Sequence, residues 1–299
     1  MIKIILAAVA LWMWCQSGAR ADDRHAETVA TDLEFPEGTI FVGDSLYFVD
    51  YARSSVLRLV NGRTEVAWHR PGCGANGLVA VSTGLLVACF DSGTVVGIST
   101  SGATMTTIRQ DDHGHAFVAP NDLAADQKGG VYFSASGSSG YPGKVFYLGA
   151  DRVVREVASG IRFANGVGVS PDGATLYVAE TPTGKVLAFA IKADGSLGAA
   201  RDFIRLRDVV AAGRNGAATP DSLRVDAHGN LFVALYDGGG VAILSPSGAL
   251  ITVVDVPSAH HTNLAISPDG KSLYVTAVDD GPQSTYRGQI VRIANPLAQ

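Results

Sequence analysis

Residues 165–195 read NGVGVSPDGATLYVAETPTGKVLAFAIKADG, and the architecture of the chain can be worked out from this stretch. Residues 166–170, 175–179 and 185–191 are rich in β-branched and aromatic side chains, which favour strands. Between the first two, Pro171-Asp172-Gly173 predicts a tight turn, because proline presets φ and glycine adopts the positive φ of many turns. Three short strands in succession are therefore expected here.

The same design recurs in six copies along the chain. Each copy starts at one polar residue, and the six are Glu37, Asn76, Asn121, Asn165, Asp221 and Thr262. The starts lie 39 to 56 residues apart, and a fourth alternating segment ends the units, as in residues 64–68 and 250–254. Repeated units of about forty residues with four short strands are typical of β-propeller blades. The sequence thus predicts an all-β fold, a six-bladed β-propeller. A β-sandwich would show turn signals at similar density, but not six copies of one pattern.

The last unit predicts how the ring closes. Only three strands can follow Thr262, because Pro296 comes directly after the segment 289–294. Residues 27–33 are expected to supply the missing outer strand, which would remove exposed sheet edges and join the N-terminal segment to the last blade. An insertion rich in Ala and Gly, around residues 207–219, is expected to lie over one mouth of the ring.

Residues 1–21 have the features of a signal peptide. Lys3 precedes an apolar run, residues 4–14, that is too short to span a bilayer comfortably, and Ala19-Arg20-Ala21 fits a cleavage site. Residues 22–299 are then the propeller domain. The mature protein is expected to be periplasmic or secreted, without membrane attachment.

Cysteine usage leaves two alternatives open. An acylated Cys15 would make the chain a lipoprotein, but the bulky Trp12-Met13-Trp14 before it matches poorly the small residues that such a site prefers. Signal cleavage removes Cys15 and leaves Cys73 and Cys89. In an oxidising compartment these two can form a disulfide, or they can be two buried thiols.

Composition and motif content exclude several classes of protein. The chain has 47% hydrophobic and 17% charged residues, which is typical of a folded domain and not of a disordered one. A net charge of −5 argues against a nucleic-acid-binding protein, which would carry a basic face. No G-x-S-x-G is present, which argues against a serine hydrolase of the nucleophile-elbow type. A closed ring with no extra helix is expected to be a monomer.

The six starting residues are candidate metal ligands, because the first strand of each blade lines the central channel of a propeller. Five of the six are carboxylates or carboxamides. Local capping of turns explains an Asn or Asp at any single position, but it does not explain Glu37. Oxygen donors with two carboxylates suit a cation such as Ca²⁺, and without one Glu37 and Asp221 would repel each other across the channel.

Four short motifs carry a resemblance to a known family. They are Pro36-Glu37-Gly38, Pro120-Asn121-Asp122, Ala164-Asn165-Gly166-Val167, and Pro220-Asp221 ahead of Leu223. With these motifs the whole mature chain resembles the gluconolactonase/regucalcin/luciferin-regenerating-enzyme family of six-bladed propellers, also called SMP-30-like. The resemblance implies that Glu37, Asn165 and Asp221 hold a divalent cation, Ca²⁺ or alternatively Zn²⁺. It implies that Asn121 binds either metal or substrate.

The resemblance also implies ester hydrolysis, usually of a lactone. The metal would polarise the carbonyl, and Asp221, or alternatively Glu37, would act as the general base. Ala119 and Leu123 stand where sugar lactonases often have arginine and lysine, so a less polar lactone or ester is expected. Two alternatives remain, namely a phosphotriesterase-like hydrolase with the same metal site and a non-catalytic binding propeller with a structural cation.

Further residues are candidates for substrate binding. Asn76 starts the second unit, and His115 and His261 lie in the loops that lead to Asn121 and Thr262. Histidine titrates near neutrality and can shuttle protons. The alternative is that both histidines are ordinary polar loop residues. Tyr236 and Phe90 are also candidates to line the cavity.

Overall fold

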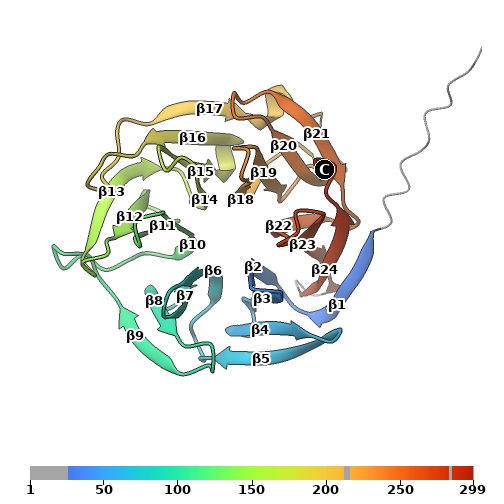
Figure 1. Ribbon diagram of the computed structural model, residues 1–299, viewed down its shortest axis with the longest axis horizontal. Helices are drawn as coiled ribbons and strands as arrows, with labels where there is room; N and C mark the ends of the chain where they lie inside the picture. Colours follow the sequence, from blue (N-terminus) through green and yellow to red (C-terminus); the bar gives the residue numbers. More distant parts are fainter. Residues whose placement is uncertain (1–25, 212–215, 283–284, 299) are drawn as a thin grey trace, which may run out of the picture.

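The computed structural model describes residues 26–211, 216–282 and 285–298. Its strands form six four-stranded antiparallel sheets arranged around a central axis (Figure 1). The prediction of an all-β, six-bladed β-propeller is confirmed. The predicted signal peptide, residues 1–21, lies outside the described residues. Within the described ranges, no helix is long and apolar enough to cross a membrane.

Each blade runs outward from the channel in chain order. Blade 1 contains β2 (Pro36–Val42), β3 (Ser45–Asp50), β4 (Ser55–Val60) and β5 (Arg63–His69). Blade 2 contains β6 (Ala75–Val81), β7 (Gly84–Cys89), β8 (Thr94–Ile98) and β9 (Thr104–Ile108). Blade 3 contains β10 (Pro120–Ala125), β11 (Val131–Ala135), β12 (Gly143–Leu148) and β13 (Val154–Ile161).

The second half of the ring repeats this order. Blade 4 contains β14 (Ala164–Val169), β15 (Thr175–Glu180), β16 (Lys185–Ala190) and β17 (Arg201–Arg205). Blade 5 contains β18 (Pro220–Val225), β19 (Leu231–Leu235), β20 (Gly240–Leu244) and β21 (Leu250–Asp255). Blade 6 contains β22 (His260–Ile266), β23 (Ser272–Asp280) and β24 (Tyr286–Ala294). Two short 3₁₀ helices, η1 (Thr181–Thr183) and η2 (Leu206–Asp208), belong to blade 4 and the segment that follows it.

The N-terminal strand β1 (Glu27–Leu33) is the outermost strand of blade 6. It pairs antiparallel with β24, from Glu27 opposite Arg292 to Leu33 opposite Gly288. The predicted closure by residues 27–33 is confirmed. Strands from the two ends of the chain thus complete one sheet, and this pairing holds the ring shut.

Six apolar clusters, one between each pair of neighbouring blades, form the core. Strand β19 shows how one strand serves two of them. Leu231 and Val233 face the cluster shared with blade 4, whereas Phe232 and Ala234 face the cluster shared with blade 6. Both faces of such a strand are buried, so its sequence is apolar at every position. This explains the high hydrophobic content together with few charges.

The insertion between blades 4 and 5 contributes to one of these clusters. Leu206, Val210 and Ala218 are buried between blades 4 and 5. Residues 212–215, which the prediction of a loop over the mouth also covered, lie outside the described residues.

Glycines beside the channel allow the inner strands to approach one another. A Cβ on Gly77 would lie 2.1 Å from the backbone oxygen of Asn121, and a Cβ on Gly166 would lie 2.5 Å from that of Asp221. Each of these glycines directly follows one of the polar starting residues. The Asn-Gly pairs are therefore needed for close packing of blades at the channel, and they are not hairpin turns.

A disulfide joins Cys73 and Cys89, which are both fully buried and have Cα atoms 4.6 Å apart. The bond closes a loop with a sequence separation of 16, for which chain entropy predicts a stabilisation of about 3 kcal/mol. The double variant Cys73→Ala/Cys89→Ala is expected to lose free energy of unfolding of this size in urea titrations. Reductant should lower the midpoint of the wild type and leave the variant unaffected. Equal midpoints for the oxidised wild type and the variant would contradict the prediction.

Candidate functional site

A cavity of about 280 Å³ opens at one end of the central channel. Its wall is formed by Phe35, Glu37, Tyr51, Asn76, Phe90, Asn121, Phe163, Asn165, Thr181, Asp221 and Tyr236. The cavity thus brings together five of the six polar residues that start the repeats. All five are buried, with 5 to 8% of their surface exposed.

The position of these five residues within their strands is the same. Each is the second residue of the innermost strand of its blade, and the ladder to the next strand shifts register at this residue or just after it. A β-bulge of this kind bends the strand and re-aims side chains, and bulges are common next to functional sites. The repeat therefore places one polar side chain per blade at the same height in the channel.

Blade 6 departs from this pattern. Thr262 is fully buried, and its hydroxyl donates to the backbone oxygen of Pro36 at 2.6 Å. It is not among the described residues that line the cavity. The sixth starting residue therefore ties blade 6 to blade 1.

The hydrogen bonds of Asn165 determine which atom of its carboxamide faces the cavity. The hydroxyl of Thr181 lies 2.7 Å from the backbone oxygen of Pro220, which can only accept, so this hydroxyl donates there. Its oxygen must then accept from the Nδ2 of Asn165, at 3.1 Å. With the nitrogen assigned in this way, the Oδ1 of Asn165 is left as an acceptor for a ligand.

Asn121 is oriented by the same arrangement one blade earlier. The hydroxyl of Ser136 donates to the backbone oxygen of Ala164 at 2.9 Å and accepts from the Nδ2 of Asn121 at 3.1 Å. Two hydroxyl groups therefore hold two amide oxygens as potential cation ligands.

The two carboxylates of the cavity are destabilised in their charged form. Burial raises the pKa of Glu37 well above its usual value, and the nearby Asp221 and Asp122 raise it further, against hydrogen bonds from the Gly38 backbone and Asn263. Burial also raises the pKa of Asp221, a hydrogen bond from Asn165 lowers it, and the nearby Asp122 and Asp237 raise it by smaller amounts. A bound cation would stabilise both carboxylates.

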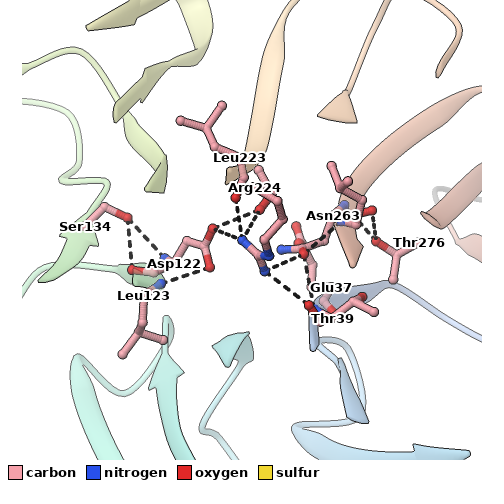
Figure 2. A network of polar contacts seen from close by, with 11 residues as sticks. Glu37, Thr39, Asp122, Leu123, Ser134, Leu223, Arg224, Asn263 and Thr276 are labelled. Carbon is pink, nitrogen blue, oxygen red and sulfur yellow. Dashed lines mark hydrogen bonds and ion pairs between the residues drawn. The ribbon is translucent and has the colours of Figure 1, made fainter. Parts of the chain in front are cut away.

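Three residues further along β18 than Asp221, Arg224 extends across the channel and contacts four blades (Figure 2). Its Nη1 lies 3.2 Å from Oδ2 of Asp122 in blade 3 and donates to the backbone oxygen of Leu223 in blade 5 at 2.6 Å. Its Nη2 donates to the backbone oxygen of Thr39 in blade 1 at 3.2 Å and to Oδ1 of Asn263 in blade 6 at 2.8 Å. One guanidinium group thus serves as an internal cation at the centre of the ring.

The ion pair between Asp122 and Arg224 determines how much negative charge is left in the cavity to balance a metal ion. The side chain of Asp122 is 2% exposed, and its partner Arg224 neutralises it. Glu37 and Asp221 then supply two negative charges, which match one divalent ion. Two carboxylates with two amide oxygens are the oxygen donors that Ca²⁺ prefers, with waters or substrate to complete its coordination, and carboxylates also serve Zn²⁺. The residues present therefore fit a divalent cation.

A second acidic group lies in a loop away from the cavity. One ligand atom each from Asp111, Asp112 and His113 lies within 4.8 Å of the others. The carboxylate of Asp111 is already engaged, because its Oδ1 accepts from the backbone N–H groups of His113 at 3.0 Å and His115 at 2.8 Å. These bonds explain the group as a brace for the loop before Asn121.

The structure places both histidines named as substrate-binding candidates outside the described cavity wall. The side chain of His115 is 66% exposed, and its Nδ1 lies 3.2 Å from the Oδ2 of Asp111. His261 is fully buried, with its two ring nitrogens 3.3 and 3.1 Å from the backbone oxygens of Leu235 and Val256. His261 occupies the position of Pro36 and Pro220 in their strands, one residue before the channel-facing position, so its ring points into the blade interface.

A different histidine, His260, packs against the cavity residue Tyr236. The ring of His260 stacks on Tyr236, with centroids 4.3 Å apart and planes at 16°. Sequence reasoning also missed Phe35, Phe163 and Tyr51. A signal for the first two exists, since each precedes a channel residue by two positions.

The burial of His261 has a consequence for stability. Burial lowers the pKa of His261 from 6.5 to about 4, although both carbonyl contacts favour the protonated ring. Above pH 6.5 the ring is neutral in both states; as the pH falls towards 4, the unfolded chain takes up a proton that the folded chain excludes. The free energy of unfolding should therefore fall by about 2.5 kcal/mol between pH 7.5 and 4.5 through this residue.

Urea titrations of His261→Gln should lack this part of the pH dependence, whereas the exposed-site control His228→Gln should retain it. The same slope in all three proteins would contradict the assignment.

Comparison with known proteins agrees with this fold. Residues 35–279 match the family model described as SMP-30/Gluconolactonase/LRE-like region. A pentonolactonase from Haloferax volcanii is 30% identical over 275 residues, covering 87% of this chain and 87% of its own length. A gluconolactonase from Zymomonas mobilis is 25% identical over 285 residues, covering 84% and 78% of the two chains.

Solved structures share the fold at lower identity. A gluconolactonase from Xanthomonas campestris superposes with a TM-score of 0.73 at 23% identity, covering 91% of each chain. A calcium-binding regucalcin from Agrobacterium tumefaciens superposes with a TM-score of 0.69 at 20% identity, covering 92% of this chain and 96% of its own. The chain belongs to the SMP-30/gluconolactonase/LRE-like family of six-bladed propellers.

Proposed function

We propose that this protein is a divalent-cation-dependent hydrolase of lactones or related carboxylic esters. The observation that carries the proposal is the pair of buried carboxylates, Glu37 and Asp221, in one cavity with the two oriented carboxamides. Distant relatives named as lactonases, at 25 to 33% identity, support the reaction class.

Glu37, Asn165 and Asp221 would hold the cation, with Ca²⁺ favoured and Zn²⁺ as the alternative. Asn121 would contribute its amide oxygen to the cation or a hydrogen bond to the substrate. When bound, the cation would polarise the ester carbonyl and stabilise the charge that develops on its oxygen. Asn76 lies in the same wall and would contact the substrate.

Asp221 is the group assigned to proton transfer, with Glu37 as the alternative. The carboxylate of Asp221 would accept a proton from the attacking water, whose oxygen forms a bond to the carbonyl carbon. The bond from that carbon to the ester oxygen then breaks, and Asp221 returns the proton to the departing oxygen. A lactone is thereby opened to a hydroxy acid, and the enzyme is regenerated.

We also propose that the mature protein begins at Asp22 and acts as a monomer outside the cytoplasm. The buried Cys73–Cys89 disulfide supports an oxidising compartment. Mass spectrometry of protein recovered from the periplasm or medium would identify the mature N-terminus, and an unprocessed or acylated chain would contradict the assignment.

The deciding experiment combines metal analysis with hydrolysis. Elemental analysis of dialysed protein is expected to give one divalent ion per chain, since Glu37 and Asp221 balance one ion after Arg224 has paired with Asp122. Chelation should abolish hydrolysis of a panel of lactones and an aryl ester, and Ca²⁺ or Zn²⁺ should restore it. The exposed-site control Asp44→Asn should behave as wild type.

Hydrolysis only of a phosphotriester would assign the phosphotriesterase-like alternative. A rise in Tm with Ca²⁺ but no turnover would indicate a binding propeller with a structural ion.

A further inference from the structure

We propose that the cavity selects esters with an uncharged apolar substituent, alkyl or aryl, close to the reacting ester group. An aromatic wall made of Phe35, Tyr51, Phe90, Phe163 and Tyr236 would bind that group. This inference rests on the proposed hydrolase function and specifies its substrate class.

The first support is the way in which the fold builds the wall. In five blades the residue directly after the second strand lies at the mouth end of the channel, and these residues are Tyr51, Phe90, Ser136, Thr181 and Tyr236. In blades 3 and 4 this position holds the hydroxyls that orient Asn121 and Asn165. In blades 1, 2 and 5 it holds an aromatic ring that lines the cavity. One structural position thus serves the metal ligands in two blades and the substrate wall in three.

On one side of the mouth the rings form a continuous arc. The ring centroids of Tyr286 and Phe35 are 4.8 Å apart, and those of Phe35 and Tyr51 are 6.0 Å apart. Tyr51 and Phe90 continue the arc at 6.0 Å and 85°. Each contact is edge to face, which is a favourable geometry for aromatic pairs. The Tyr51 hydroxyl donates to Oδ1 of Asp91 at 2.8 Å, which fixes its ring.

Across the mouth, Tyr236 is held just as firmly. Its ring stacks on His260, whose Nδ1 lies 3.1 Å from the backbone oxygen of Tyr236 and 3.4 Å from Oδ1 of Asp237. Phe163 has 41% of its surface exposed to solvent, whereas most large apolar side chains of this chain are buried. A preorganised apolar wall of this kind binds apolar groups at little entropic cost.

The chemistry of the wall disfavours acidic and polyhydroxylated substrates. No lysine, arginine or histidine side chain is among the described residues that line the cavity. The partly buried Arg224 in the channel is already bonded to Asp122 and Asn263. Once Glu37 and Asp221 have balanced the cation, the described wall offers no cationic side chain to pair with an acidic group of a substrate. A polyhydroxylated ring would leave hydroxyl groups unpaired against aromatic faces.

The test compares lactones that differ in the substituent alone. Cation-loaded wild type is expected to hydrolyse γ-nonalactone with a kcat/KM about 1,000-fold above that of γ-butyrolactone, because the pentyl chain adds five carbons and each buried methylene is worth a factor of about four. D-glucono-δ-lactone should be the poorest substrate. Phe90→Ala should lower the nonalactone-to-butyrolactone ratio about tenfold. Met105→Ala, at an exposed apolar residue of the outer strand β9, should leave that ratio unchanged.

Binding of ketones that cannot be hydrolysed separates this inference from the hydrolase proposal. By calorimetry, 3-pentylcyclopentanone, which has the shape of γ-nonalactone, should bind more tightly than cyclopentanone, and Phe90→Ala should weaken that preference. If no lactone is turned over but the ketone preference holds, the hydrolase proposal fails and the apolar wall stands. A preference for the sugar lactone, or a ratio that Phe90→Ala does not change, overturns the inference.

Discussion

Asp221→Asn is expected to lower kcat for lactone hydrolysis by about 10³-fold and to remove most of the affinity for the divalent cation. The substitution keeps the shape of the side chain but removes one of the two charges that balance the ion, together with the proposed base. Stopped assays of hydrolysis and calorimetric titration with Ca²⁺ measure the two effects.

Thermal unfolding controls for damage to the fold. Burial raises the pKa of Asp221, so its ionised form does not stabilise the metal-free protein, and Asp221→Asn should unfold at the same Tm as metal-free wild type or higher. Wild type and Asp44→Asn should gain Tm on addition of Ca²⁺, because a ligand that binds only the folded state stabilises it. Asp221→Asn should not. A variant that keeps both this gain and a kcat within tenfold of wild type would contradict the assigned site.

The starting residues of the repeats could be predicted from the sequence because they belong to a local pattern. Asn121, Asn165 and Asp221 each stand next to an apolar strand, and a propeller repeats that strand at one radius of the ring. The six-bladed fold and the closing strand 27–33 could be predicted for the same reason. Each follows from strand patterns of a few residues and needs no knowledge of distant contacts.

Residues that face each other across the ring could not be predicted in this way. Asp122 and Arg224 are 102 positions apart, and their pairing exists only once blades 3 and 5 face the same channel. His261 illustrates a shift of one position. It directly precedes Thr262, but the strand turns its ring between two blades, where burial lowers its pKa to about 4.

The aromatic wall shows a third limit. Tyr51 directly follows the second strand of its blade, a position defined by the strand end and not by a recognisable motif. At the same position blade 4 carries Thr181, so the residue type gives no repeat to detect. Only the three-dimensional register shows that these residues are equivalent.

Arg224→Met is expected to lower the free energy of unfolding by about 3 to 5 kcal/mol, because it leaves the carboxylate of Asp122 buried and without its cationic partner. The loss should be visible in urea titrations of metal-free protein. It should exceed the effect of any exposed ion pair, such as that between Arg58 and Glu65, since exposed pairs contribute at most about 1 kcal/mol.

The double variant Asp122→Asn/Arg224→Met decides between loss of charge pairing and loss of packing. If the buried unpaired carboxylate causes the destabilisation, removing its charge should recover about half of the loss or more, and the two substitutions should be strongly non-additive. If Arg224 acts mainly through its bonds to the backbone oxygens of Leu223 and Thr39, the double variant should be no more stable than Arg224→Met. The first result would show that Arg224 neutralises Asp122 (Figure 2), which leaves the carboxylates of Glu37 and Asp221 to balance a divalent ion.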